Sequence, residues 1–261
     1  MNKAKMRGTK RNGAKANAAV HEKKLVAGIK AFFKSAGKKK AVVGLSGGID
    51  SAVVLSLLVK TLGKENVAAI MMPNTSLTHK QNMVDAQNLA TELGVTHFAI
   101  EIDDFLHTFA ELPWSQSEIA RANLNARVRA VILYNYANSN DALVAGTGNK
   151  SELYMGYFTK YGDAAADFFP IADLYKKDVR ALAEHMGLPR EFLEKVPSAE
   201  LWEGQEDEKE MGMTYEVLDE LLPLILAGKK IPKEKRKIAE KISKVIKATE
   251  HKRAAPPILR V

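Results

Sequence analysis

Length, composition and charge set the first limits on what this chain can be. It has 261 residues, of which 46% are hydrophobic and none is cysteine, and its formal net charge is +8. The length allows one large α/β domain, or one domain with a helical appendage. The missing cysteines exclude disulfides, thiolate zinc sites and a cysteine nucleophile from these residues. No apolar run reaches the ~20 residues that span a bilayer, and the basic N-terminus lacks the apolar stretch of a secretory signal, so we expect a cytoplasmic protein without a membrane partner.

The positive charge is concentrated in two segments. Residues 1–19 hold six Lys/Arg and no acid, and residues 229–253 hold eleven Lys/Arg against three Glu. These segments contribute +6 and +8, which leaves −6 for the rest of the chain. An acidic centre disfavours binding along a nucleic-acid backbone. We expect residues 1–19 to form a solvated, disordered basic tail, which could still contact polyanions.

Apolar patterning predicts strands that alternate with helices. The first helix is expected at 20–33, where Leu25, Ile29 and Phe33 share one face. Buried strands are predicted at 41–45, 67–72, 96–102 and 142–146. Helices are predicted between them at 52–62, 79–93 and 117–137. The alternation implies βαβ units, and therefore an α/β fold with a doubly wound, mainly parallel sheet of the Rossmann-like type.

After residue 146 the strand signal fades, and the C-terminal part is expected to be helical. Helices are predicted at 174–186, 215–226 and 233–249. The acid-rich stretch 204–212 begins and ends with glycine, which predicts a mobile surface loop. A second mobile segment is expected at about 74–80. We expect residues 20–261 to form a single domain.

One six-residue string carries the clearest chemical signal. Ser46-Gly47-Gly48-Ile49-Asp50-Ser51 follows the first predicted strand and opens a helix. Adjacent glycines let the backbone approach a phosphate closely, and a helix N-terminus adds free N–H donors and a positive dipole. Asp50 would repel a phosphate unless a cation lies between them, and a hard divalent ion such as Mg²⁺ is the natural bridge. The string predicts an ATP-phosphate site, whereas the alternative is a glycine-rich turn whose Ser and Asp only cap the helix.

No lysine occupies this loop, unlike the Gly-x-x-x-x-Gly-Lys-Ser/Thr loop of kinases and GTPases. The string resembles instead the signature of the ATP pyrophosphatase superfamily, whose adenine nucleotide alpha hydrolase-like members cleave ATP between its α- and β-phosphates. Further segments resemble the NAD synthetase family, in order and spacing, over about residues 25–253. They are Asn-Ala-Arg-Val-Arg at 125–129, Gly-Thr-Gly-Asn-Lys-Ser-Glu at 146–152, Gly-Tyr-Phe-Thr-Lys-Tyr-Gly-Asp at 156–163, Asp-Phe-Phe-Pro at 167–170, Leu-Tyr-Lys at 174–176, Pro-Ser-Ala-Glu-Leu-Trp at 197–202 and Glu-His-Lys-Arg at 250–253.

The resemblance implies a role for each matching residue. Asp50, Lys160 and Lys176 would be the catalytic groups, and Asp50 and Glu152 would bind Mg²⁺. A homodimer with shared substrate pockets is also implied, with the helix near 117–137 and the segment after residue 152 at the interface. ATP would be held by Gly44, Leu45, Ser46, Gly47, Gly48, Ile49, Asp50, Ser51, Thr147, Lys176 and Ser198. Deamido-NAD, the nicotinic acid dinucleotide, would be held by Arg127, Lys160, Asp167, His251 and Lys252.

The chemistry of these residue types agrees with the implied roles. Lys160 and Lys176 can neutralise charge that builds on phosphates. Asp167 only accepts hydrogen bonds, which suits sugar hydroxyls. Arg127 and Arg129 could instead form surface ion pairs.

Three positions depart from the family pattern. Ile49 stands where glutamine is frequent, Ser198 stands in place of threonine, and Glu200 stands in place of aspartate. The hydroxyl is retained at Ser198, so a contact with ATP is still expected there. The roles of Arg129 and Glu200 stay open.

We therefore expect ATP- and Mg²⁺-dependent amidation of deamido-NAD by ammonia through an acyl-adenylate, which yields NAD, AMP and pyrophosphate. Ammonia is expected as the donor because the chain has no cysteine for a glutaminase site. Two alternatives stay open. One is another ligase of the superfamily, such as a GMP synthetase-like enzyme, and the other is a sensor that binds ATP without turnover.

Overall fold

The fold is built around a four-stranded parallel sheet. This computed structural model describes residues 3–198, 200, 202 and 204–260, and the side chains from residue 16 onward. The strands are β1 (Lys40–Gly44), β2 (Val67–Met71), β3 (Thr96–Ala99) and β4 (Ala142–Ala145), in the order β3-β2-β1-β4. Every neighbouring pair is parallel. The predicted strands and the predicted parallel α/β sheet are confirmed.

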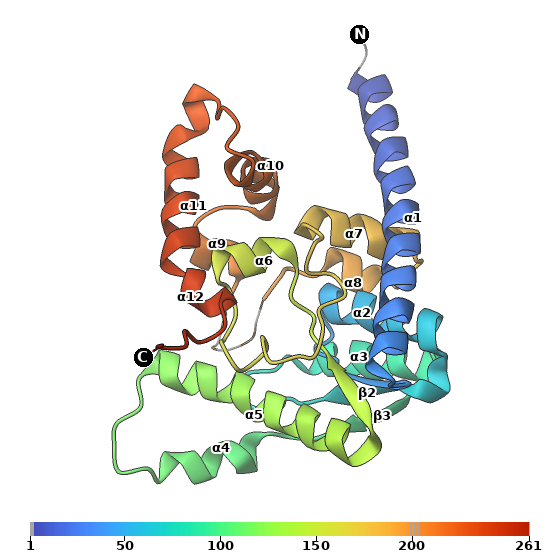
Figure 1. The fold of residues 1–261 in the computed structure, drawn as a ribbon, viewed down its shortest axis with the longest axis vertical. Helices are drawn as coiled ribbons and strands as arrows, with labels where there is room; N and C mark the ends of the chain where they lie inside the picture. Colours follow the sequence, from blue (N-terminus) through green and yellow to red (C-terminus); the bar gives the residue numbers. More distant parts are fainter. Residues whose placement is uncertain (1–2, 199, 201, 203, 261) are drawn as a thin grey trace.

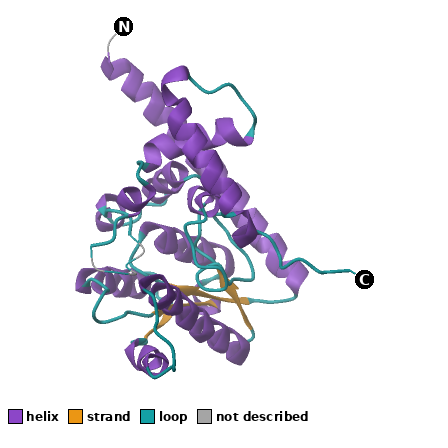
Figure 2. Cartoon of the chain, turned by 90° about the vertical axis from the view of Figure 1, so that its left-hand side faces the viewer, coloured by secondary structure: helices purple, strands orange, loops and turns teal. Residues whose placement is uncertain are grey.

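Helices cover both faces of the sheet (Figure 2). The helices are α1 (Lys3–Ala36), α2 (Ile49–Leu62), α3 (Lys80–Glu92), α4 (Asp103–Ala110), α5 (Glu118–Asn140), α6 (Lys150–Met155), α7 (Lys176–His185), α8 (Arg190–Glu194), α9 (Asp207–Met211), α10 (Tyr215–Leu226), α11 (Arg236–Ala248) and α12 (Glu250–Arg253).

Alternate residues of β1 face opposite layers because side chains on a strand alternate between its two faces. Ala41 and Val43 pack with α1, α2, α3 and α7, whereas Val42 packs with α5 on the other face. A doubly wound sheet requires helices on both faces. The connections put α2 and α3 on one face and α5 on the other, as that architecture demands.

A third hydrophobic cluster lies in the C-terminal part of the chain. It joins α6, α9, α10 and α11 around buried residues that include Met155, Met211, Tyr215 and Ile242. Figure 1 shows α10, α11 and α12 on the side of the molecule opposite α1. The predicted helical C-terminal part is therefore present, and it meets the sheet-bearing part at α6 and α7. None of the helices formed by the described residues is long and apolar enough to cross a membrane.

Two boundaries differ from the sequence prediction. Helix α1 begins at Lys3 rather than at residue 20, and Figure 1 shows it extending beyond the body of the molecule. Residues 1–2 of the expected tail lie outside the described residues, and its disorder in solution stays a prediction. The placement of 204–212 as a surface loop is wrong, because α9 forms there with Asp207 and Met211 buried. Its mobility stays a prediction, as does that of 74–80, and residue 203 lies outside the described residues.

Candidate active site

The string from Ser46 to Ser51 forms a compact turn between β1 and α2. Gly47 has φ +77°, a left-handed conformation that favours glycine. A Cβ atom there would lie 2.3 Å from the carbonyl oxygen of Asn82 in α3, so no larger residue fits. The buried Ser51 hydroxyl donates to the Gly48 carbonyl at 3.0 Å and accepts from the Ser46 amide at 3.2 Å. The two serines therefore shape the loop.

Lys176 forms the electrostatic centre of the site. Its side chain is only 3% exposed, and its Nζ lies 2.5 Å from Asp50 Oδ2 and 3.1 Å from Glu152 Oε1. Burial alone would lower the pKa of Lys176, but Asp50 and Glu152 more than offset this effect and raise it above its ordinary value. Burial raises the pKa of Glu152 to about 7, against the attraction of Lys176 and with the repulsion of Asp50. Lys176 is therefore a charged ammonium at neutral pH.

Asn149 joins Asp50 to Glu152 on the far side of this ion cluster. Its Nδ2 donates to Asp50 Oδ1 at 2.9 Å, and its Oδ1 accepts from the Glu152 amide at 3.1 Å. The Glu152 carboxylate in turn accepts from the Asn149 amide, so the two residues form a capping box at the start of α6. Asn149 is not among the predicted site residues, although its spacing of three residues from Glu152 is the sequence signal of a capping box.

A second buried pair supports the N-terminal turn of α7. The Ser151 hydroxyl donates to Asp219 Oδ1 at 2.5 Å, and it accepts from the Lys176 amide at 3.1 Å. Asp219 Oδ2 accepts from the Lys177 amide at 2.7 Å. Both side chains are fully buried. Helix α10 thus fixes the backbone that carries Lys176, a contact between residues too far apart in the chain for a sequence pattern to indicate.

Tyr215 extends the cluster toward α9. Its hydroxyl donates to Asp207 Oδ2 at 2.9 Å and lies 3.4 Å from Glu152 Oε1, and its ring centroid is 5.1 Å from Lys176 Nζ. Burial raises the pKa of Asp207, against the hydrogen bond from Tyr215. Asp207 Oδ1 is buried and has no hydrogen-bond partner among the described residues. The α9 segment therefore borders the ion cluster directly.

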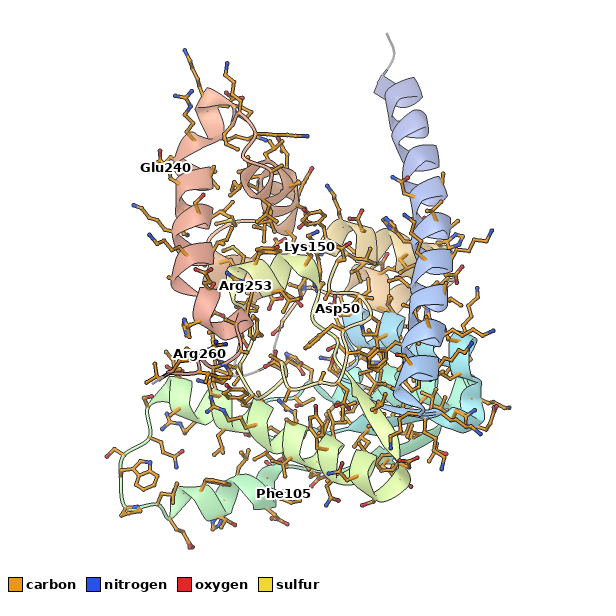
Figure 3. All side chains as sticks on the ribbon, viewed as in Figure 1. Asp50, Phe105, Lys150, Glu240, Arg253 and Arg260 are labelled. Carbon is orange, nitrogen blue, oxygen red and sulfur yellow. The ribbon has the colours of Figure 1, made fainter. Side chains whose placement is uncertain are left out.

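A cavity of about 890 Å³ opens beside the ion cluster, at the carboxyl ends of the strands. Figure 3 shows Asp50 near the middle of the molecule. Gly47 of the Ser46–Ser51 loop packs against Asn82 of α3 and does not line the cavity. The sequence-predicted residues that do line it are Gly44, Leu45, Ser46, Gly48, Ile49, Asp50, Ser51, Thr147, Glu152, Lys176, Ser198 and Lys252.

Most residues implied for deamido-NAD lie outside this cavity. Lys160 Nζ donates to the His251 carbonyl at 2.6 Å, and Arg127 Nη2 donates to the Lys160 carbonyl at 3.4 Å. These three residues form one group between α5 and α12, in which Arg127 and His251 are exposed and Lys160 is partly buried. Asp167 lies apart from them, where its Oδ2 accepts from the Val144 amide at 2.7 Å on β4. Of the residues implied for deamido-NAD, only Lys252 lines the cavity. Its Nζ donates hydrogen bonds to the backbone carbonyls of Gly156 and Phe158.

Arg129 and Glu200 also reach the cavity. Arg129 Nε donates to the Met72 carbonyl at 2.9 Å, and burial lowers the pKa of its guanidinium. Glu200 Oε1 accepts from Asn82 Nδ2 at 2.5 Å and from the His79 amide at 3.3 Å. Glu200 has φ +49°, which is strained for a residue with a side chain. Arg129 is therefore not in a surface ion pair, and Glu200 ties its segment to the start of α3.

The donor set suits a hard divalent cation. Asp50 and Glu152 present carboxylate oxygens at one side of the cavity, and Mg²⁺ in nucleotide enzymes commonly takes one or two carboxylates together with substrate phosphates. No three His, Asp or Glu side chains among the described residues gather as a metal-binding group. The two carboxylates therefore fit Mg²⁺ brought in with a nucleotide better than a metal held by protein alone.

Fold and cavity together define a nucleotide-binding α/β enzyme. The family model described as NAD synthase matches residues 21–256. The chain belongs to the NAD synthase family, and it is a ligase of NAD biosynthesis. The predicted family is confirmed.

Relatives support this placement across most of the chain. The chain is 49% identical over 233 residues to the NH(3)-dependent NAD(+) synthetase of Archaeoglobus fulgidus. The aligned region covers 89% of this chain and 93% of the relative. The structure resembles NMN synthetase from Francisella tularensis, with a TM-score of 0.85, 37% identity and coverage of 94% of this chain and 99% of that one. It also resembles the NH3-dependent NAD synthetase from Campylobacter jejuni, with a TM-score of 0.78, 31% identity and coverage of 93% and 99%.

The raised pKa of Glu152 predicts a pH effect on stability. Between the ordinary pKa of 4.5 and the folded value of about 7, Glu152 is ionised in the unfolded chain but protonated in the fold. Its contribution to the unfolding free energy therefore falls as pH rises through this window and is constant above it. We expect wild type to lose stability relative to Glu152→Gln from pH 4.5 to 7, as measured by denaturant unfolding of metal-free protein. A stability difference that does not change with pH would contradict the assignment.

Proposed function

We propose that this enzyme amidates the nicotinate carboxylate of deamido-NAD with ammonia, while ATP is cleaved to AMP and pyrophosphate. The observation that carries the proposal is the position of the Lys176 ammonium, which pairs with Asp50 and Glu152 and lines the same cavity as the Ser46–Ser51 loop. A buried ammonium beside a glycine-rich anion loop suits a reaction that develops charge on phosphate oxygens. The relatives are named NH(3)-dependent NAD(+) synthetases, which supports ammonia as the nitrogen donor and NAD as the product.

The proposed reaction has two steps. In the first, a carboxylate oxygen of deamido-NAD attacks the α-phosphorus of ATP, which forms a C–O–P bond and releases pyrophosphate. In the second, ammonia attacks the carbonyl carbon of the acyl-adenylate, the C–O bond to AMP breaks, and the attacking nitrogen loses a proton as the amide forms. Neither step needs a covalent enzyme nucleophile.

The side chains of the site act by binding and orientation. Backbone N–H groups of the Ser46–Ser51 loop would hold the β- and γ-phosphates, and Lys176 would face the α-phosphate, where negative charge develops. Thr147 and Ser198 line the same cavity and would contact the nucleotide. Asp50 and Glu152 would hold Mg²⁺, which when bound supplies positive charge against the phosphate oxygens. An enclosing cavity would keep water from the adenylate.

A second candidate substrate follows from one comparison. The structure from Francisella tularensis is named NMN synthetase, so the same fold there serves a mononucleotide product. The corresponding reaction here would amidate nicotinic acid mononucleotide by the same two steps. The two candidate substrates can be compared by assaying the same protein with ATP, ammonium and either deamido-NAD or nicotinic acid mononucleotide. The true substrate is the one that is converted with the higher kcat/KM.

Asp50→Asn tests the proposed chemistry. Removing the negative charge leaves Lys176 with one carboxylate and would weaken the proposed magnesium site, so we expect the rate of NAD and AMP formation to fall by about 100-fold or more. The fall should appear in kcat, measured with saturating ATP, Mg²⁺, ammonium and deamido-NAD. Wild-type protein that binds ATP but forms no AMP would identify a sensor instead. Activity of the variant near that of wild type would show that Asp50 has no such role.

We also propose that the enzyme is a homodimer whose interface includes α4 and α5. Apolar side chains are exposed there, and Figure 3 places Phe105 at the outer edge of the molecule. They are Phe105, Phe109, Trp114, Ile119 and Val131, with Ile119 and Val131 71% and 69% exposed. Large apolar patches on a single chain are typical of interfaces. The group of Arg127, Lys160 and His251 lies beside the same helix, where a second subunit could complete a substrate pocket.

Val131→Asp tests this interface. A charge in the centre of an apolar interface is expensive to bury, so we expect the variant to become monomeric in light scattering while wild type has twice the mass of one chain. Because Arg127, Lys160 and His251 of the implied deamido-NAD residues lie on that side, its KM for deamido-NAD should rise more than its KM for ATP. A control, Val20→Asp, changes a half-exposed valine on α1. Wild type that is itself monomeric would refute the dimer.

A further inference from the structure

The phosphate loop contains no lysine of its own, but a distant lysine reaches it. Lys195 ends α8, and its Nζ donates to the carbonyl oxygen of Gly47 at 2.8 Å. The side chain is 23% exposed and borders the same cavity as Ser46 and Asp50. The two residues are 148 positions apart in the chain. The fold therefore supplies to this loop, from a distant part of the chain, the cation that the loop's own residues lack.

Asp85 holds Lys195 in this position. Lys195 Nζ lies 2.8 Å from Asp85 Oδ2, and Gln81 Nε2 donates to Asp85 Oδ1 at 2.7 Å. Asp85 lies on α3 and is only 3% exposed. Burial would raise the pKa of Asp85, but the hydrogen bonds from Lys195 and Gln81 lower it below its ordinary value, so the carboxylate is ionised. The ion pair holds the Lys195 ammonium at its contact with the Gly47 carbonyl.

The contact with Gly47 fixes the direction of one peptide group. In a planar trans peptide the C=O and the following N–H point in opposite directions. Because Lys195 holds the Gly47 carbonyl, the Gly48 N–H points away from Lys195, toward Ser46 Oγ at 3.2 Å. Ser46 and Gly48 both line the cavity. The Gly48 N–H therefore lies in the wall of the cavity, where it donates to the Ser46 hydroxyl.

A peptide between two glycines needs such a restraint. Glycine populates positive and negative φ with similar ease, so a Gly-Gly peptide can rotate to point its carbonyl the other way. In the rotated state the Gly47 carbonyl oxygen would face the phosphate site and repel an anion. Gly47 is already at φ +77°, and its packing against Asn82 restrains its Cα but not the plane of the peptide that follows.

We propose that Lys195, anchored by Asp85, is a positioning residue that locks the Gly47–Gly48 peptide with its N–H toward the ATP phosphates. The inference rests on the proposed function of the Ser46–Ser51 loop as the phosphate-binding segment. It gives Lys195 no contact with the reacting atoms. The contacts of Lys195 with Gly47 and Asp85 are separate from those that join Lys176 to Asp50 and Glu152. Loss of Lys195 should therefore weaken ATP binding without slowing the chemical step.

The test is direct calorimetry of ATP binding, in the presence of Mg²⁺, to the full-length protein. Lys195→Met removes the ammonium and keeps the length of the side chain, and we expect its Kd for ATP to rise about tenfold, as for the loss of a hydrogen bond from a charged donor. Lys195→Arg keeps a cationic donor that can reach both the carbonyl and Asp85, so its Kd should stay within about threefold of wild type. Equal weakening in both variants, or none in Lys195→Met, would overturn the proposal.

Asp85→Asn distinguishes a lock from a direct charge contact. If Lys195 acts through the peptide, loosening its anchor weakens ATP binding in the same direction as Lys195→Met. If Lys195 instead binds phosphate itself, release from Asp85 leaves the Kd unchanged or lowers it, and that outcome would overturn the lock. The matched control is Arg190→Met on α8, whose partner Glu194 is at the surface, and it should bind ATP as wild type does.

Steady-state kinetics distinguish a specific loss of ATP binding from a general loss of folded enzyme and from a defect in the chemical step. We expect the KM for ATP to rise in Lys195→Met, while kcat at saturating ATP and the KM for deamido-NAD stay within about twofold of wild type. A lower kcat with an unchanged KM for ATP would indicate a merely structural role and refute the proposal. Calorimetry needs no turnover, so the binding result still decides the inference if wild type fails to make NAD.

Discussion

A buried ammonium group between two carboxylates is the interaction on which the site depends. Lys176 is almost fully buried, and a charge in that position is tolerable only with partners of opposite sign. Asp50 comes from the first turn of α2, Glu152 from α6 and Lys176 from the start of α7. Three segments that are distant in sequence must therefore meet within hydrogen-bonding distance. The parallel sheet makes this possible because β1 and β4 are neighbours, so the segments that follow them begin at the same edge.

The contacts around the cluster form successive layers of support. Asn149 links the two carboxylates, Ser151 and Asp219 fix the backbone of α7, and Tyr215 covers the Lys176 ammonium. The last two residues lie on α10, in the C-terminal helical part. Asp207 and Glu210 of α9 and Lys252 of α12 line the cavity itself, so the C-terminal part forms one wall of the site. The same arrangement explains why Asp207 and Met211 of α9 are buried beside the cavity.

The helices, strands and individual residues of this site can be predicted from the sequence, whereas most contacts between them cannot. The strand-to-helix alternation predicted the parallel sheet, since buried strands and amphipathic helices differ in their hydrophobic periodicity. Glycines and Asp50 marked the phosphate loop, and the family resemblance singled out Glu152 and Lys176. Nothing local indicated that Asp219 would bond to Ser151, or that Lys195 would reach Gly47, because those pairs depend on how separate helices pack. The stretch 204–212 was misplaced because its acids suggest solvent, whereas Tyr215 and the C-terminal core bury Asp207.

The central claim is that this cavity activates a carboxylate by transferring adenylate to it. Deamido-NAD with both carboxylate oxygens labelled with ¹⁸O tests that claim most directly, by mass spectrometry of the products. Attack on the α-phosphorus followed by displacement at the carbonyl predicts one ¹⁸O atom in AMP and one in the amide of NAD. An AMP product without label, with ¹⁸O in pyrophosphate or inorganic phosphate instead, would contradict the account.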